Sequence, residues 1–385
     1  MTIDTDVKPN GYAAAAAVSP AVRAHFLHSI DDARRRGDVN LPAVPDEAAI
    51  ARMIDTAFWA SLRREEGYAP KISLAYVRPT DTVHPLCFAA EVPLEAGALT
   101  RIAPAVERPG IHLGVHHRGS TLSVWGVART IPKYCLVVEV AEPGLLVVKH
   151  HRGETQAKFV NVAVLQGDQV KIVDEHASSL PDCPSLLTSL LGFDAPGTWA
   201  GSVNVTVQLA VSMREHRRGG LLLVVPAGSD VWRESIALPL TYAVSPAYSE
   251  LSVLAHGPGE GVSPRAWREE LGRAVDALAG LTAIDGATIL NSDYELLAFG
   301  AKVVRRKGST TVEQLTFTEP ILGVDPAVVT PAQLGGTRHL AAAQFVHDQR
   351  DALALVASQD GRFTVIAYSP CEAMVHAHRV DTLLL

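Results

Sequence analysis

The sequence predicts a mixed α/β protein with two domains, and three observations support this prediction. The chain has 385 residues, which is too long for one ordinary hydrophobic core. Between residues 71 and 173, short apolar runs are broken by Gly, Pro and Asp, a pattern typical of strands. After residue 200, runs with helical spacing alternate with fully apolar runs, which is typical of an α/β domain.

The first seventy residues predict a flexible start followed by a helical arm. Residues 1–20 are small and alanine-rich, and we expect them to be poorly ordered. From there to about residue 68, apolar side chains such as Val22, Phe26 and Ile30 recur four positions apart. We therefore assign residues 1–70 to a flexible start and a short helical arm.

Residues 71–180 predict an α+β or mainly β domain. A helix is expected at about residues 94–106. Seven strands are expected, at 72–77, 110–115, 122–128, 136–140, 145–149, 160–165 and 170–173.

Two identical His-His-Arg-Gly segments, at residues 116–119 and 150–153, each follow an apolar strand. Four imidazoles could bind zinc or copper if the two turns met in space. Adjacent strand residues point to opposite faces, which favours two hairpin tips with glycine at positive φ. A third alternative is that the basic pairs bind phosphate.

Composition and charge exclude several classes of function. The formal net charge of −7 argues against a broad nucleic-acid-binding surface. No apolar run reaches the roughly 18 residues of a membrane span, and Asp4 and Asp6 are unlike a signal peptide. The four cysteines form no CxxC pair, which indicates free thiols. We expect a cytoplasmic protein without membrane contact.

The third segment, residues 200–385, contains two polar motifs next to regular elements. A helix at 203–216 is followed by Gly219 and Gly220 and then by an apolar strand, which predicts a strand buried on both faces. A helix at 264–281 leads into Asp285-Gly286-Ala287, and a second glycine-rich segment precedes a helix through residues 341–346.

That second segment, Gly335-Gly336-Thr337-Arg338-His339, has the features of a phosphate site. Free N–H groups and the helix dipole favour an anion at a helix start. Thr337 adds a hydroxyl donor, and Arg338 adds a guanidinium that suits phosphate oxygens. The alternative is an ordinary helix start with Thr337 as the N-cap and Arg338 in solvent. Asp285-Gly286 alone would more often be a turn.

Together, the two motifs and the order of elements resemble the diadenylate cyclase domain, and the DNA-integrity-scanning type in particular. The resemblance covers about residues 202–385. The matching positions are Asp285, Gly286 and Ala287, then Gly336, Thr337, Arg338 and His339, and finally Ser358 at the end of a strand. The resemblance implies a central mixed sheet flanked by helices.

The same resemblance implies a function and roles for these residues. Asp285 would be catalytic and would hold a Mg or Mn ion beside the ribose of ATP. The remaining matched residues, from Gly286 and Ala287 to Ser358, would contact the nucleotide, and His339 would shape the helix start. Cyclase chemistry needs two domains face to face, so a homo-oligomer is expected.

The sequence also departs from the family pattern, chiefly at Leu340, where the family has a second arginine. Loss of one cationic donor can cost about 10²–10³ in rate. The basic triplet at 305–307 could compensate, or it could be an exposed hairpin tip within residues 301–317. The amino-terminal half resembles the extra domain of degenerate relatives of the DACNV type, which indicates a sensor role for residues 71–180.

These observations predict a protein that binds a nucleotide or cyclic dinucleotide and acts as a sensor with weakened or lost catalysis. The alternative is an active diadenylate cyclase that joins two ATP molecules into cyclic di-AMP. A third alternative is a structural protein whose motifs are relics of the fold.

Overall fold

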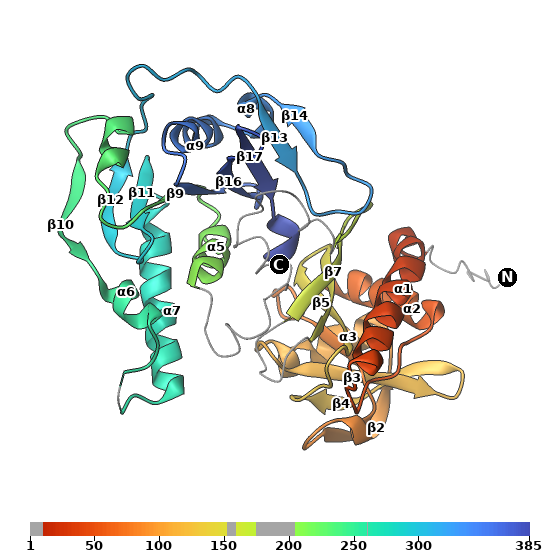
Figure 1. Cartoon of the computed structure of the whole chain (residues 1–385). Helices are drawn as coiled ribbons and strands as arrows, with labels where there is room; N and C mark the ends of the chain where they lie inside the picture. Colours follow the sequence, from red (N-terminus) through yellow and green to blue (C-terminus); the bar gives the residue numbers. More distant parts are fainter. Residues whose placement is uncertain (1–10, 152–158, 175–204, 260) are drawn as a thin grey trace. The chain divides into compact units, whose positions relative to one another are not determined.

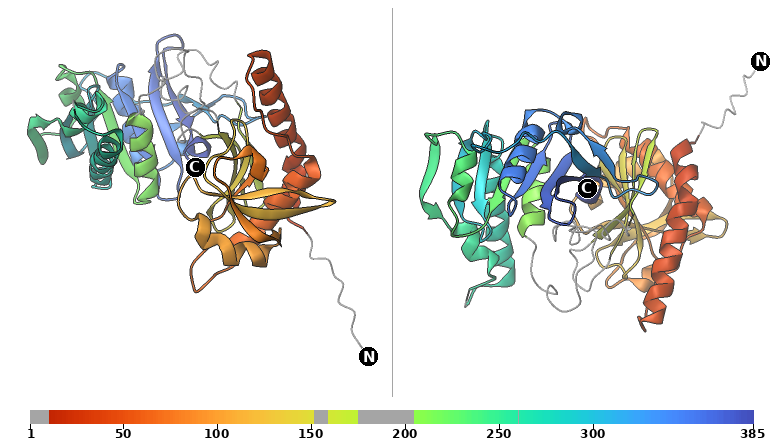
Figure 2. Two further views of the ribbon diagram at one scale, coloured as in Figure 1. Left: turned by 90° about the horizontal axis from the view of Figure 1, so that it is seen from below. Right: turned by 45° about the horizontal axis from the view of Figure 1, so that its top comes forward.

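The computed structural model describes residues 11–151, 159–174, 205–259 and 261–385 (Figures 1 and 2). It divides into two compact units, which we call the amino-terminal unit (residues 1–173 with Leu385) and the carboxyl-terminal unit (174–384). Each unit has its own sheet and helices, so the predicted mixed α/β class is confirmed. The expected boundary between 180 and 200 lies outside the described residues.

Two helices precede the first sheet: α1 (Ala13–Arg35) and α2 (Glu47–Ser61). The expectation of poor order is wrong from Ala13 onward, because alanine is the strongest helix former and here it continues the helix. The start of α2 is fixed by Asp46, whose carboxylate accepts a hydrogen bond from the Ala49 N–H at 2.7 Å.

The amino-terminal sheet has eight strands in the order β2-β4-β3-β1-β5-β6-β7-β8. β1 and β3 are parallel, and the other neighbours are antiparallel. The seven expected strands are present, and β2 is an eighth that the sequence analysis missed. The bounds are β1 Ser73–Tyr76, β2 Leu86–Pro93, β3 His112–Arg118, β4 Thr121–Ala128, β5 Leu136–Glu142, β6 Leu145–His151, β7 Phe159–Gln166 and β8 Gln169–Ile172.

The helices of this unit share one hydrophobic core with the sheet. The expected helix at 94–106 is α3 (Ala96–Ile102), which continues as a 3-10 turn through Val106. Buried side chains of α1, α2 and α3, such as Phe26, Ile50 and Leu99, pack in the same cluster as Leu74 of β1. Figure 2 shows α1 lying along this sheet. The helical arm is therefore part of the same compact unit as the strands.

The carboxyl-terminal sheet has nine strands in the order β10-β12-β11-β9-β15-β16-β17-β13-β14. β9 is parallel to β11 and antiparallel to β15, so the sheet is mixed. The bounds are β9 Gly220–Val225, β10 Tyr242–Tyr248, β11 Ala287–Asn291, β12 Leu296–Ala301, β13 Leu315–Thr318, β14 Ala327–Val329, β15 Leu353–Ala357, β16 Phe363–Ser369 and β17 Met374–Arg379.

Helices cover both faces of this sheet (Figure 1). Alternate residues of β9, Leu221, Leu223 and Val225, pack with α9 on one face, while α5 and α7 pack together on the other. The expected burial of β9 on both faces is confirmed. The bounds are α5 Val205–Glu215, α6 Glu250–Ala255, α7 Pro264–Leu281, α8 Pro331–Leu334 and α9 Thr337–Asp348, with 3-10 turns at Val231–Ser235 and Asp381–Leu383.

The expected hairpin at residues 301–317 is wrong, although its turn is present at Gly308, which has a φ of 85°. The two flanking segments do not pair with each other. β12 pairs with β10 and β11, whereas β13 pairs with β14 and β17 near the other edge of the sheet. The segment between β12 and β13 is thus a connection across the unit.

Candidate functional site

Strand directions bring the two sequence motifs to one end of the carboxyl-terminal sheet. Thr288 of β11 pairs with Leu222 of parallel β9, and Ala357 of antiparallel β15 pairs with Gly220. The starts of β9 and β11 and the end of β15 therefore lie side by side. We call this place, with Gly219, Asp285, Lys302, Arg338 and Ser358, the Asp285 end.

The first turn of α9 also lies at the Asp285 end. Its N-cap is Gly336, which has no side chain to cap the helix, so the first N–H groups lack the usual side-chain acceptor. Thr337 is the first helical residue and is exposed. The alternative in which Thr337 caps the helix is therefore not what the structure has.

Arg338 folds back toward the start of β9. A Cβ on Gly219 would lie 2.9 Å from Nη1 of Arg338, and Gly219 has a φ of 72°. Glycine is needed here for both reasons, since other residues rarely adopt this φ and their side chain would meet the guanidinium. Arg338 is partly buried against this glycine and is not simply in solvent.

Asp285 is the acidic group of this end, and its side chain is 90% exposed. Nζ of Lys302 donates a hydrogen bond to its carboxylate. The pKa of Asp285 is lowered, first by Lys302 and further by Arg338. Two cations thus act on the Asp285 carboxylate. Lys302 is a site residue that the sequence analysis missed.

A close approach between two glycines places Lys302. A Cβ on Gly286 would collide with the backbone of Gly300, and Gly286 has a φ of 117°. Gly300 in turn lies under the ring of Tyr242, which stacks on Phe299 with 4.8 Å between ring centroids. β12 is therefore held against the Asp-Gly turn, and the residue after its last strand position, Lys302, reaches Asp285.

His339 lies behind the surface of this end and is 4% exposed. A Cβ on Gly335 would lie 2.5 Å from Nδ1 of His339, so the glycine makes room for the imidazole. Nε2 of His339 and Oγ1 of Thr364 are 3.4 Å apart. Burial, and next Arg379, lower the pKa of His339 to about 4, so the ring is neutral at pH 7. His339 is placed to position the helix start.

The remaining motif residues, Ala287 and Ser358, lie in or beside the strands of the same end. Ala287 is buried as the first residue of β11. Ser358 follows β15 in a turn in which its N–H donates to the Arg362 carbonyl at 2.9 Å. Nε2 of the next residue, Gln359, donates to the carbonyl of Arg218 at 3.5 Å, which ties this turn to the start of β9.

The basic triplet at 305–307 lies at the other end of α9, so the idea that it compensates for Leu340 is wrong. The backbone N–H of Arg306 donates to Asp348, the last residue of α9, at 2.8 Å. Twelve helical residues separate this place from the start of α9, which is about 18 Å. Leu340 itself is 44% exposed in the first turn.

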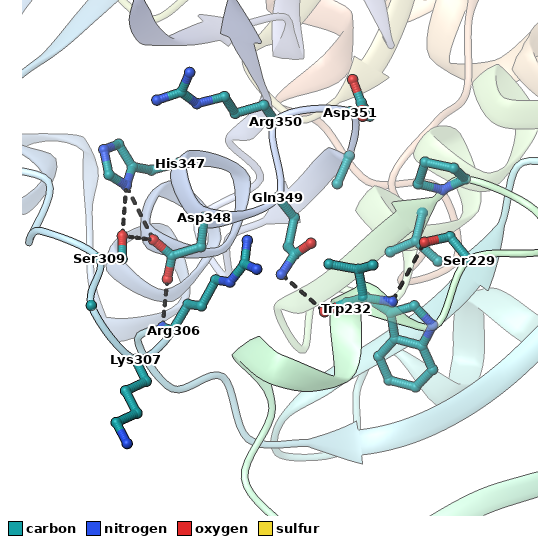
Figure 3. Close-up of a pocket in the computed structure, with 15 residues that line it drawn as sticks. Ser229, Trp232, Arg306, Lys307, Ser309, His347, Asp348, Gln349, Arg350 and Asp351 are labelled. Carbon is teal, nitrogen blue, oxygen red and sulfur yellow. Dashed lines mark hydrogen bonds and ion pairs between the residues drawn. The ribbon is translucent and has the colours of Figure 1, made fainter.

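A pocket of about 610 Å³ lies at this opposite end, which we call the Asp348 end (Figure 3). It is lined by residues from the end of β9, by Arg306 and Lys307 of the basic triplet and by the end of α9. Asp348 also accepts hydrogen bonds from Ser309 Oγ and, at 2.9 Å, from Gln344 Nε2. Nδ1 of His347 lies 3.1 Å from the same carboxylate. This carboxylate is fully occupied by partners within the chain.

The two His-His-Arg-Gly segments of the amino-terminal unit do not form a metal site. β3 and β6 are separated by β1 and β5, which places their ends about 14 Å apart. Gly119 has a φ of 63° in the turn after β3, as expected for a hairpin tip. His150 and His151 are buried in β6, and the Arg and Gly that follow them lie outside the described residues. In the part of the chain that is described, no three metal-ligating side chains gather.

Comparisons with known proteins bear first on the amino-terminal unit. Residues 39–129 match the family described as "Probable sensor domain DACNV". The match runs from before α2 to the end of β4, so it ends inside the eight-stranded sheet, which continues through β5 to β8. No curated protein matches the sequence.

Two solved structures are similar to parts of the chain. One is a hypothetical membrane-spanning protein from Bacillus cereus, with 16% identity over 50% of this chain and 69% of that chain, at a TM-score of 0.25. The other is DacA from Staphylococcus aureus, with 14% identity over 45% of this chain and 83% of that chain, at a TM-score of 0.23. Neither score is high enough to assign a fold. None of the described helices is long and apolar enough to cross a bilayer.

Proposed function

We propose that the carboxyl-terminal unit binds a phosphate-bearing ligand, a nucleotide or cyclic dinucleotide, at the Asp285 end, and that the protein is a sensor of it. The observation that supports this most directly is the position of Arg338. It extends from the first turn of α9, where the helix dipole favours an anion, into the space left by Gly219. A guanidinium beside a helix start without a side-chain cap is suited to phosphate oxygens.

The other groups of the Asp285 end fit the same ligand. Thr337 is exposed and can donate its hydroxyl, and Ser358 lies in the turn next to the start of β9. Tyr242, which is 47% exposed and is stacked on Phe299, offers an aromatic face near Asp285 on which a base could stack. Phosphate and base thus each have a group of the right chemistry.

Sensing is favoured over catalysis by the charge of the site and by the family match. Leu340 contributes no charge in the turn where a second cation would assist phosphoryl transfer. The amino-terminal unit contains the segment that matches a probable sensor domain. In this proposal ligand binding to the carboxyl-terminal unit is coupled to the amino-terminal unit.

The intact Asp-Gly-Ala segment favours a second candidate, an active diadenylate cyclase. In that reaction each 3′-hydroxyl attacks the α-phosphate of the other ATP, and two pyrophosphates leave. Face-to-face assembly of two copies would be required, whereas sensing has no such requirement.

Calorimetric titration with ATP and with cyclic di-AMP tests the proposal, together with mass spectrometry of the nucleotides after incubation. We expect binding without turnover, and we expect Arg338→Ala to abolish binding while the protein stays folded. Lys307→Ala is the matched control, because it removes an exposed cation at the Asp348 end, and it should bind as the wild type does.

Two results would contradict the proposal in different ways. Unchanged affinity in Arg338→Ala would refute the phosphate role of this end. A cyclic dinucleotide product that disappears in Asp285→Asn would establish the cyclase instead of the sensor.

A further inference from the structure

The resemblance to diadenylate cyclases implies a divalent metal at Asp285, and the residues present do not fit one. Mg²⁺ in nucleotide sites is usually held by one or two carboxylates together with ligand phosphates. Among the described residues, no three metal-ligating side chains gather, so Asp285 is not part of a ready-made metal cluster. Its carboxylate is already bonded to the ammonium of Lys302.

The position of Lys302 is fixed by its backbone as well as by its charge. Its carbonyl accepts a hydrogen bond from the Ala237 N–H at 2.8 Å, and the next residue, Val303, bridges to Ile236. On the other side, the contact between Gly286 and Gly300 holds β12 against the Asp-Gly turn. The backbone contacts with residues 236–237 and with Gly286 therefore hold the Lys302 ammonium beside Asp285.

We propose that Lys302 takes the place of the divalent cation at Asp285, so that the site binds its phosphate ligand without metal. This inference rests on the proposed function. The ammonium neutralises the carboxylate, which would otherwise repel a phosphate, and the charge of Arg338 is left for the ligand. A metal ion at the same carboxylate would have to displace Lys302 and would meet the repulsion of Arg338.

The proposal also explains how a catalytic motif can remain in a binding protein. An ammonium can balance the charge of Asp285, but it has no open coordination positions with which to join two phosphate oxygens or to activate a ribose hydroxyl. Asp285 then serves to hold Lys302 in place. Retention of the Asp-Gly-Ala segment does not require phosphoryl transfer.

The experiment is a titration of ATP and of cyclic di-AMP into wild-type protein and Lys302→Met, each in EDTA and in saturating Mg²⁺. We expect wild-type protein to bind in EDTA. Lys302→Met should lose at least about tenfold in affinity in EDTA, since a charged partner is removed, and Mg²⁺ should restore it. Lys307→Met, an exposed lysine at the Asp348 end, is the control and should behave as wild type in both buffers.

A direct metal readout separates this inference from the proposed function. Wild-type protein should bind no Mn²⁺ and should leave the electron paramagnetic resonance signal of the free ion unchanged. Lys302→Met should gain a Mn²⁺ site and broaden that signal. The double variant Lys302→Met/Asp285→Asn should lose this site again. Wild-type binding that requires Mg²⁺ would overturn the role of Lys302 and leave the proposed function standing. Absence of binding in both buffers would overturn both.

Discussion

Asp285 and Asp348 lie at opposite ends of the carboxyl-terminal sheet and differ in what surrounds their carboxylates. Asp348 is 9% exposed and receives hydrogen bonds from the backbone N–H of Arg306 and the side chains of Ser309 and Gln344. Asp285 is exposed and has Lys302 as its ion-pair partner. A carboxylate that accepts several hydrogen bonds from within the chain stabilises the fold, whereas an exposed one with an ion-pair partner can still respond to a ligand.

The largest effect that this comparison predicts is on stability at the Asp348 end. Asp348→Ala removes the acceptor of three donors, two in the segment between β12 and β13 and one in α9. The free energy of unfolding should therefore fall by about 2–4 kcal/mol. Urea unfolding measures this. Asp351→Ala is the control, since it removes an exposed carboxylate from the same pocket and should have little effect. Equal stability of both variants would break the comparison.

A second prediction concerns the buried layer of the Asp285 end. The pKa of His339 is lowered from 6.5 to about 4, so the unfolded chain takes up its proton first as pH falls. The stability that neutral His339 contributes is therefore fully present above pH 6.5 and is lost between there and about pH 4. The expected slope is about 1.4 kcal/mol per pH unit. Urea midpoints across this range should show a shallower slope in His339→Gln, and an identical slope would contradict the prediction.

A third prediction separates backbone strain from the contact with Arg338. Gly219 and Gly228 have the same φ of 72°, but a Cβ on Gly228 would meet nothing within 4 Å. Alanine at either position should cost about 1–2 kcal/mol for the left-handed backbone. Gly219→Ala should in addition displace the guanidinium of Arg338 and weaken nucleotide binding. Titration calorimetry checks this, and equal affinity in the two variants would exclude a role for the space beside Gly219.

The smallest expected effect on stability is that of Asp285→Asn. Exposed ion pairs contribute little to folding, because water solvates both charges in the unfolded chain. The urea midpoint of this variant should equal that of the wild type, while Asp348→Asn should lower it. A large loss in Asp285→Asn would show that the Asp285 end is structural.

The sequence predicts the elements with strong periodicity and misses those that depend on pairing. The helix at 264–281 and the buried strand after Gly220 were found because their apolar patterns are continuous. β10 and β17 were missed: β10 is largely exposed and contains Pro246, and in β17 histidines alternate with apolar residues. Alanine-rich residues near the start were expected to be disordered, although their helix propensity is high.

Part of the candidate site could be predicted, and part could not. The glycines, Asp285 and Arg338 follow from motif chemistry, and strand order shows that they lie at one end. Lys302 gives no local signal, because its contact with Asp285 arises from the close approach of Gly286 and Gly300. The distance of the basic triplet from Asp285 likewise depends on the direction of α9, which spacing alone does not reveal.

The pairing of β9 with β15 has a consequence for when the site can form during synthesis. Gly220 pairs with Ala357, so the Asp285 end is incomplete until β15 has left the ribosome. Contacts between residues so far apart in sequence also form slowly, since a long loop must close first. A nascent chain that has not yet exposed β15 therefore lacks part of the ligand site, and the first binding event would mark a molecule in which β9 and β15 have paired.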